Sequence, residues 1–213
     1  MYESKGNCIQ KKSLKNSELA IRQVSKPTNG LIRTSQALGA GVQSRDLAEL
    51  VEMGVLTKVS RGLYRLTDLP PVADPDLVTI AMRVPRGVVG LVSALSFHDL
   101  TTQIPREIQV ILKFGSEKPR LDYPPTKFFW FSGKAYSDGI EAHTVDGIPI
   151  NVYSVEKSLA DCFKFRNKIG IDVAVEALRA WAPKNRRKWD NLLHFAKICR
   201  VEKLVRQYLE GLG

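Results

Sequence analysis

The sequence contains no apolar run of the length that crosses a membrane, which takes about 18 consecutive residues. Its N-terminal segment also lacks the apolar core of a secretory signal peptide. The apolar fraction is 44% and the charged fraction is 25%, values typical of a soluble globular protein. We therefore expect a cytoplasmic protein that has no membrane as a partner.

Cysteine and histidine are scarce, with three of each in 213 residues. No two cysteines form a CxxC pair, and their odd number argues against a disulfide framework. The histidines, His98, His143 and His194, are far apart in sequence and have no acidic or thiol companions at the spacing of a metal motif. We expect no metal and no cofactor, and we expect Cys162 and Cys199 to pack in helices as buried thiols.

Catalytic motifs are equally sparse. His98 and Asp99 are adjacent, and adjacent side chains rarely converge on one proton. Ser154 and Lys157 have the SxxK spacing, but the companion motifs of that enzyme family are missing. The sequence therefore favours a binding protein over an enzyme.

Positive charge, by contrast, is in excess: the net charge is +10 and the pI about 9.6. Residues 1–70 carry 11 Lys and Arg against 6 Asp and Glu, and residues 157–213 carry 13 against 6. Residues 71–156 carry 8 against 10. An excess of this size, concentrated at both ends of the chain, indicates a polyanionic partner.

A proline-rich segment, Asp68–Asp76, suggests a stiff linker, since its three prolines disfavour a regular helix. We place a domain boundary there. The predicted domains are residues 1–70 and residues 71–213.

The first predicted domain has the element order of a winged helix-turn-helix. Apolar spacing and turn residues predict three helices, over 14–24, over 34–38 and from Ser44 to just before Gly54. Residues 31–32 are predicted as a short strand or a core-anchoring loop. Strands 56–60 and 63–66 are predicted to form a hairpin. In this hairpin we expect Val59, Leu63 and Leu66 to face the helices. The cations Lys58, Arg61 and Arg65 would then face outward.

Three groups of residues in this domain are candidate DNA contacts. They are Thr34, Ser35 and Gln36 at one helix start, Gln43, Ser44 and Arg45 at the next, and Lys58, Arg61 and Arg65 on the hairpin. A helix start that enters the major groove can read bases, whereas hairpin cations would hold phosphates without choosing sequence. The alternatives are that Thr34 and Ser44 only cap helices, that Arg45 is a solvated charge, and that the hairpin tip is an ordinary turn.

The second predicted domain mixes strands with helices, which indicates an α+β fold. We predict helices over 77–82, 88–97, 171–181, 189–198 and 201–209, strands over 108–112 and 128–131, a hairpin around Asp146–Gly147, and a helix capped by Ser154 and interrupted by Gly170.

Two further sets of cations are candidates for a toxin or nucleic-acid surface. They are Lys157, Lys164, Arg166 and Lys168, and the run Lys184, Arg186, Arg187 and Lys188. The spacing of Asp161 from Lys157 and Lys164 permits surface ion pairs, so residue by residue a solvated helix face is the simpler interpretation. For the second run the alternative is a polar loop between helices.

Three segments resemble the AbiEi family of antitoxins from type IV toxin–antitoxin, or abortive infection, systems. They read GVQSRDLAELVEMGVLTKVSRGLYRL, SALSFHDLTTQIPREIQVIL and INVYSVEKSLADCFKFRNKIGIDVAVEAL. The resemblance extends over roughly residues 15 to 180 in the same order. The RGLYRL hairpin is moderately specific by itself, and its combination with the later segments is more specific.

The resemblance implies an N-terminal winged helix-turn-helix that binds double-stranded operator DNA and represses its own operon, and we expect the operator to contain inverted repeats. It implies a C-terminal antitoxin domain that protects against a nucleotidyltransferase-like toxin, and it leaves open whether the two proteins touch. The alternatives are a stand-alone winged-helix regulator whose second domain senses a ligand, or a nucleic-acid-processing enzyme.

Overall fold

The computed structural model of the chain describes residues 3–70 and 72–212. The chain divides into two compact units, residues 1–83 with 144–149 and residues 84–143 with 150–213. The segment 75–83, which we assigned to the second domain, groups with the first unit, and the domain boundary at residues 70 and 71 stays a prediction. Among the described residues, no helix is both long enough and apolar enough to cross a membrane.

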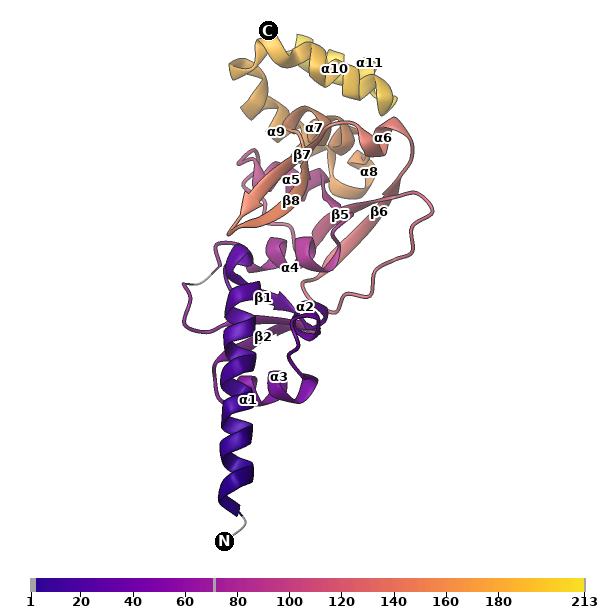
Figure 1. Ribbon diagram of the computed structural model, residues 1–213. Coiled ribbons are helices and arrows are strands. Elements are labelled where there is room, and N and C mark those ends of the chain that lie inside the picture. Colours follow the sequence, from indigo (N-terminus) through magenta and orange to yellow (C-terminus); the bar gives the residue numbers. More distant parts are fainter. Residues whose placement is uncertain (1–2, 71, 213) are drawn as a thin grey trace. The chain divides into compact units, whose positions relative to one another are not determined.

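The first unit combines helices with a small antiparallel sheet of order β1-β3-β2 (Figure 1). Its elements are α1 (Glu3–Val24), the 3-10 turn η1 (Lys26–Thr28), β1 (Leu31–Arg33), α2 (Thr34–Gly39), α3 (Ser44–Glu52), β2 (Leu56–Ser60), β3 (Leu63–Leu66) and α4 (Pro75–Arg83). Helix α1 begins well before Leu14, the first residue of the helix that the apolar spacing predicted. The segment at residues 31–32, left open as strand or loop, is a strand.

Both faces of this sheet are buried. Ile32 and Leu66 belong to the core that also includes residues of α1 and α3. Leu31 and Leu63 lie on the opposite face, because side chains alternate along a strand, and they are 2% and 0% exposed. The prediction that Val59, Leu63 and Leu66 share one face is therefore wrong: Leu63 and Leu66 are three positions apart in one strand and must point in opposite directions.

The connection from α3 to β2 is a Schellman motif. The Gly54 N–H donates to the Val51 carbonyl at 3.0 Å, and the Val55 N–H donates to the Leu50 carbonyl at 3.0 Å. Gly54 has φ +72°, a conformation that glycine adopts without strain. The predicted end of this helix at Gly54 is confirmed, and the motif fixes where β2 leaves the helix.

The second unit is built around a five-stranded mixed sheet of order β6-β5-β4-β8-β7. Strands β5 and β6 are parallel, and β4 is antiparallel to β5 and parallel to β8. The strands are β4 (Val88–Val89), β5 (Ile108–Lys113), β6 (Thr126–Phe131), β7 (Ile140–Val145) and β8 (Ile148–Tyr153), with the hairpin tip at 144–149 grouped with the first unit. The α+β fold class is confirmed.

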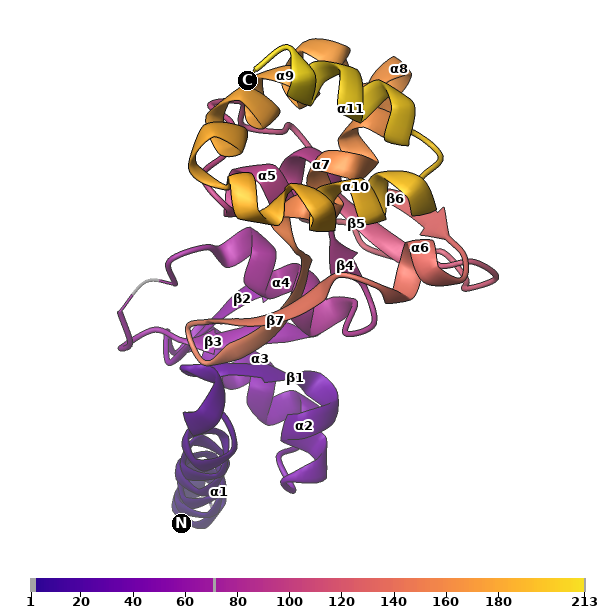
Figure 2. The same cartoon turned by 90° about the horizontal axis from the view of Figure 1, so that it is seen from above.

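Helices fill the rest of this unit, with α10 and α11 stacked beyond α7 as seen from the sheet (Figures 1 and 2). They are α5 (Leu91–Phe97), α6 (Lys134–Ser137), α7 (Val155–Lys164), α8 (Arg166–Ile169), α9 (Ile171–Trp181), the 3-10 turns η2 (Ala182–Lys184) and η3 (Arg186–Lys188), α10 (Trp189–Ile198) and α11 (Glu202–Glu210). Leu159, Cys162 and Phe163 of α7 are fully buried, as predicted, and Cys199 is 3% exposed.

Local sequence signals placed several boundaries correctly. Asp146 and Gly147 have φ values of 50° and 78°, the pair of positive angles that a type I′ hairpin requires. The Ser154 side chain accepts from the Lys157 N–H and caps α7. Gly170, with φ 92°, separates α8 from α9.

The helix predicted over 88–97 is wrong in its first residues. Val88 and Val89 form a strand in the middle of the sheet, and each is 1% exposed. A Cβ on Gly90 would lie 2.4 Å from the Ile111 side chain, so the chain passes very close to β5 before α5 begins at Leu91. Apolar periodicity alone does not distinguish such a short buried strand from the start of a buried helix.

Candidate nucleic-acid interface

The first turn of α3 is exposed and has no side-chain cap. Gln43 occupies the N-cap position with φ −83° and ψ 151°, and no side-chain cap hydrogen bond forms there. The prediction that Ser44 caps the helix is wrong, because Ser44 is the first helical residue. Gln43, Ser44 and Arg45 are all exposed, and the Arg45 side chain is 71% accessible. The Ser44 hydroxyl is therefore not engaged in capping.

The buried carboxylate of Asp46 anchors this turn from behind. Asp46 is 3% exposed, and its Oδ2 accepts a 2.6 Å hydrogen bond from the Ser17 hydroxyl of α1. Its Oδ1 lies 3.5 Å from Arg45 Nε. Sequence spacing could not predict this pair, because Ser17 and Asp46 are 29 residues apart. The contact fixes α3 against α1 and so fixes the direction in which the exposed first turn points.

The start of α2 is less available than we predicted. The N-cap is Arg33, not Thr34, and the Gln36 side-chain oxygen accepts from the Arg33 N–H at 3.0 Å. The Thr34 N–H donates to the Gly62 carbonyl at 3.0 Å. The Thr34 amide and the Gln36 carbonyl oxygen are therefore engaged within the protein, while Ser35 is exposed.

The hairpin carries two exposed cations, Lys58 in β2 and Arg61 at the tip. The tip is held in place at its backbone, because Arg83 of α4 donates from Nη1 to the Arg61 carbonyl and the Gly62 carbonyl accepts from α2. Gly62 has φ +73°, which fits a tight bend. The Arg61 side chain thus extends from a fixed turn.

Arg65 differs from these two cations. It is half-buried, and its Nη2 donates to the carbonyls of Leu69, at 3.1 Å, and Pro70. The expectation that Arg65 faces outward is wrong, because the segment after β3 folds back onto the guanidinium.

Arg33 is a further cation near the hairpin tip and was not among the predicted DNA contacts. Burial lowers the pKa of its guanidinium, and the nearby charge of Arg83 lowers it further. Arg33, Arg61 and Arg83 therefore concentrate positive charge around the hairpin tip.

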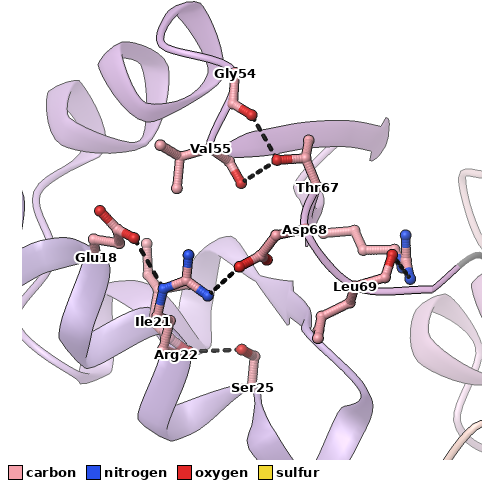
Figure 3. A network of polar contacts seen from close by, with 10 residues as sticks. Glu18, Ile21, Arg22, Ser25, Gly54, Val55, Thr67, Asp68 and Leu69 are labelled. Atoms are coloured by element: carbon pink, nitrogen blue, oxygen red, sulfur yellow. Dashed lines mark hydrogen bonds and ion pairs between the residues drawn. The ribbon is translucent and has the colours of Figure 1, made fainter.

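An ion-pair network joins α1 to the end of the hairpin (Figure 3). Arg22 of α1 donates from Nε to Glu18 at 2.9 Å and from Nη1 to Asp68 at 2.8 Å. Both contacts raise the pKa of Arg22, and the hydrogen bond to Asp68 has the larger effect. Asp68 lies two residues after the end of β3, so the pair fixes the end of the hairpin to α1.

A second contact in Figure 3 joins the two ends of the hairpin. The Thr67 hydroxyl donates to the carbonyls of Gly54 and Val55, at 2.5 and 3.0 Å, and the Thr67 N–H donates to Val55 at 3.1 Å. The base of the hairpin is thereby tied to the loop that follows α3. Helix α3 and the β2–β3 hairpin are therefore held together by hydrogen bonds as well as by the apolar core.

The cations we assigned to a surface of the second unit do not all lie on a surface. Lys157 is 0% exposed, so it is not part of any such surface. Arg166 is half-buried and donates to the Phe163 carbonyl at 3.0 Å, whereas Lys164 and Lys168 are exposed beside the Phe165 ring. Lys184, Arg186, Arg187 and Lys188 are exposed and fall in two 3-10 turns instead of a plain loop.

These exposed cations form two groups instead of one patch. Lys188 lies 3.8 Å from Glu156 in the first turn of α7, while Lys164 is the last residue of that helix. Eight residues of α-helix rise about 12 Å. The two groups therefore flank opposite ends of α7.

Lys157 and Asp161 form a buried ion pair instead of the predicted surface pair. Both side chains are 0% exposed, and Lys157 Nζ contacts Asp161 Oδ2. The Cys199 thiol donates to Asp161 Oδ1 at 3.1 Å, and the ammonium lies 4.4 Å from the centre of the Tyr153 ring. Burial raises the pKa of Asp161, while Lys157 and Cys199 oppose this effect. Burial and the Asp161 charge raise the pKa of Cys199 to about 12.

Two histidines that are distant in sequence lie together in the second unit. The rings of His98 and His143 have centroids 5.7 Å apart, and the Phe97 ring contacts both. Our expectation of no metal site relied on the separation of these residues along the chain, and the fold removes that separation.

The comparison with protein families finds a match within the first unit. Residues 21–67 match the family described as transcriptional regulator, AbiEi antitoxin. This part of the N-terminal unit is similar to an AbiEi-type regulator domain. The matched segment runs from the end of α1 to the residue after β3, so the AbiEi-type domain includes α3, the hairpin and the whole three-stranded sheet.

Solved structures that are similar over most of the chain include one from a mycobacterium. The RV2827C protein from Mycobacterium tuberculosis aligns with a TM-score of 0.53 and 14% identity, covering 91% of this chain and 80% of that chain. At this identity the likeness shows a shared fold. A search of curated protein sequences found no match.

Proposed function

We propose that the protein is an antitoxin that binds operator DNA through a winged helix-turn-helix and represses its own operon, acting in the cytoplasm without catalysis. In this proposal α3 enters the major groove, and Gln43, Ser44 and Arg45 face the bases. Lys58 and Arg61 on the wing hold phosphates, which positions the domain without choosing sequence. The observation that carries the proposal is the exposed, uncapped first turn of α3, held from behind by the Ser17–Asp46 hydrogen bond.

The role of Arg45 is tested with two substitutions. Titrations of labelled duplex from the protein's own upstream region, with a scrambled duplex beside it, measure affinity for operator and for random DNA. If Arg45 forms a bidentate contact to guanine, both Arg45→Ala and Arg45→Lys weaken operator binding by about 1–3 kcal/mol, since lysine keeps the charge and loses the fork. Equal losses on both duplexes, with recovery in Arg45→Lys, would make Arg45 a phosphate contact.

The wing is tested by salt dependence. Arg61→Ala should weaken binding to both duplexes and lower the slope of log affinity against log salt by about 0.9, the contribution of one phosphate contact. Lys26→Ala, an exposed cation of η1 outside the proposed interface, is the matched control. An Arg61→Ala variant that keeps the wild-type slope would remove the wing from the interface.

We further propose that the second unit supports protection against a nucleotidyltransferase-like toxin through one of its two exposed basic groups. Co-expression of the full chain with the toxin measures rescue of growth. Replacing Lys184, Arg186, Arg187 and Lys188 by glutamine tests one group, and replacing Lys164 and Lys168 tests the other. If each variant rescues growth fully at wild-type protein levels, neither basic group is needed for protection and this proposal is wrong.

A further inference from the structure

Three possible metal ligands converge on one side of the sheet in the second unit. His98 is the C-cap residue of α5, and Glu141 and His143 stand two positions apart in β7. Side chains two positions apart on a strand point to the same face. One ligand atom from each of the three residues lies within 4.8 Å of the other two.

A backbone carbonyl selects the tautomer of a neutral His98 ring. Its Nε2 lies 2.9 Å from the Tyr153 carbonyl, which can only accept, so Nε2 carries the proton and Nδ1 keeps its lone pair. Tyr153 is itself fixed, because it is fully buried and its hydroxyl donates to the Tyr136 carbonyl at 2.7 Å. A histidine whose second nitrogen donates to a carbonyl is the usual arrangement of a metal-binding imidazole.

His143 supplies a buried nitrogen that lacks a hydrogen bond. Its Nε2 has no hydrogen-bond partner among the residues that the structure describes, although it lies 3.3 Å from Glu141 Oε2. A buried polar atom without a hydrogen-bond partner normally has an explanation, and a bound ion is one of them. The separation also suits a shared ion, since two ligands about 2.0–2.1 Å from a tetrahedral Zn²⁺ are about 3.3 Å apart.

We propose that His98 Nδ1, His143 Nε2 and a Glu141 carboxylate oxygen bind a divalent transition-metal ion, Zn²⁺, with water in the fourth position. Two imidazoles and one carboxylate favour Zn²⁺ over the hard cations Mg²⁺ and Ca²⁺, which prefer oxygen ligands. The ion connects the C-terminal end of α5 to β7. The proposal is independent of DNA binding, because all three ligands belong to the second unit.

The experiment uses the full chain without an affinity tag, freed of metal by a chelator and carrying Cys8→Ser to remove a competing thiol. Calorimetric titration with Zn²⁺ should show one site per chain, with Mg²⁺ giving no comparable binding. Adding Zn²⁺ should also raise Tm relative to EDTA, because an ion that binds only the folded state stabilises it.

Variants then separate a metal site from a simple His143–Glu141 ion pair. His143→Ala and Glu141→Gln should each weaken Zn²⁺ binding by at least about tenfold, as even outer-sphere changes do. His194→Ala, which removes an exposed histidine of α10, should leave the affinity unchanged. Circular dichroism and Tm in EDTA establish that each variant folds. Absence of saturable Zn²⁺ binding, or equal affinity in folded wild type, His143→Ala and Glu141→Gln, would overturn the proposal.

Discussion

Two helices of this protein each bury one aspartate, and the partners of the two carboxylates differ. Asp46 of α3 accepts from a neutral hydroxyl, that of Ser17, and lies beside the exposed Arg45. Asp161 of α7 contacts Lys157 and Cys199, and all three groups are removed from solvent. One carboxylate is thus linked to the surface, and the other belongs entirely to the core.

The difference shows what each buried charge does for the fold. The exposed Arg45 charge lies next to Asp46, so burying the Asp46 carboxylate orients a surface turn at a small cost in stability. Asp161 and Lys157 lie in a low-dielectric interior, where each charge depends on the other for compensation. We expect the Asp161 network to dominate stability, and the Ser17–Asp46 contact to matter more for the interface.

The largest effect should come from breaking the interior pair. Lys157→Met leaves the Asp161 carboxylate buried without its cation, which should lower the free energy of unfolding by about 3–5 kcal/mol. Urea denaturation followed by circular dichroism measures this change.

The double variant Lys157→Met with Asp161→Leu provides the control. Replacing both charges by apolar groups of similar volume is often nearly neutral, so the double variant should be more stable than Lys157→Met alone. If the two variants are equally unstable, the loss comes from packing and not from an unpaired charge.

The corresponding change in the first unit should be smaller. Ser17→Ala removes the hydroxyl donor and leaves a buried carboxylate oxygen without its partner, at a cost of about 1–3 kcal/mol. Because this contact also orients α3, operator affinity should fall in parallel, and the further effect of Arg45→Ala should shrink. Ser13→Ala on the same helix is the control for both measurements.

Local signals in the sequence predicted much of the fold. Asp146–Gly147, Ser154, Gly54 and Gly170 act within a turn or two of chain, so each placed its boundary without knowledge of the tertiary structure. The prediction of a helix over 88–97 was wrong in its first residues for the opposite reason. Val88 and Val89 form a strand only because β5 and β8 lie on either side of them.

Pairs distant in sequence were beyond this reasoning. The i, i+4 spacing of Lys157 and Asp161 predicted that the two side chains touch. It did not predict that they are buried, because their burial depends on helices that come later in the sequence and pack against α7. Ser17 with Asp46, and His98 with His143, meet only through the fold. The exposure of Arg45, Lys58 and Arg61 was predictable from the sequence. That of Arg65 was not, because its partners come from the segment after β3.

The thiol partner of Asp161 should make stability depend on alkaline pH. The pKa of Cys199 rises from its ordinary 9.0 to about 12, so above pH 9 the unfolded chain loses this proton while the folded protein keeps it. The unfolded state then binds fewer protons, and stability falls as pH rises. At pH 10 the loss from this thiol is about 1.4 kcal/mol. Cys199→Ser keeps a donor without this titration, so its stability should fall less between pH 8 and 10, measured by urea denaturation at each pH.

The smallest effect should come from Asp68, an aspartate that is neither buried nor isolated. Its side chain is 54% accessible, and the Arg22 side chain that pairs with it is 38% accessible. Water and salt screen such a pair, so a double-mutant cycle with Arg22→Met and Asp68→Asn should give a coupling of about 0.2–1 kcal/mol, decreasing at high salt. A coupling as large as the effect of Lys157→Met would mean that burial does not decide the worth of a charge pair in this protein. The contrast between Asp46 and Asp161 would then need another cause.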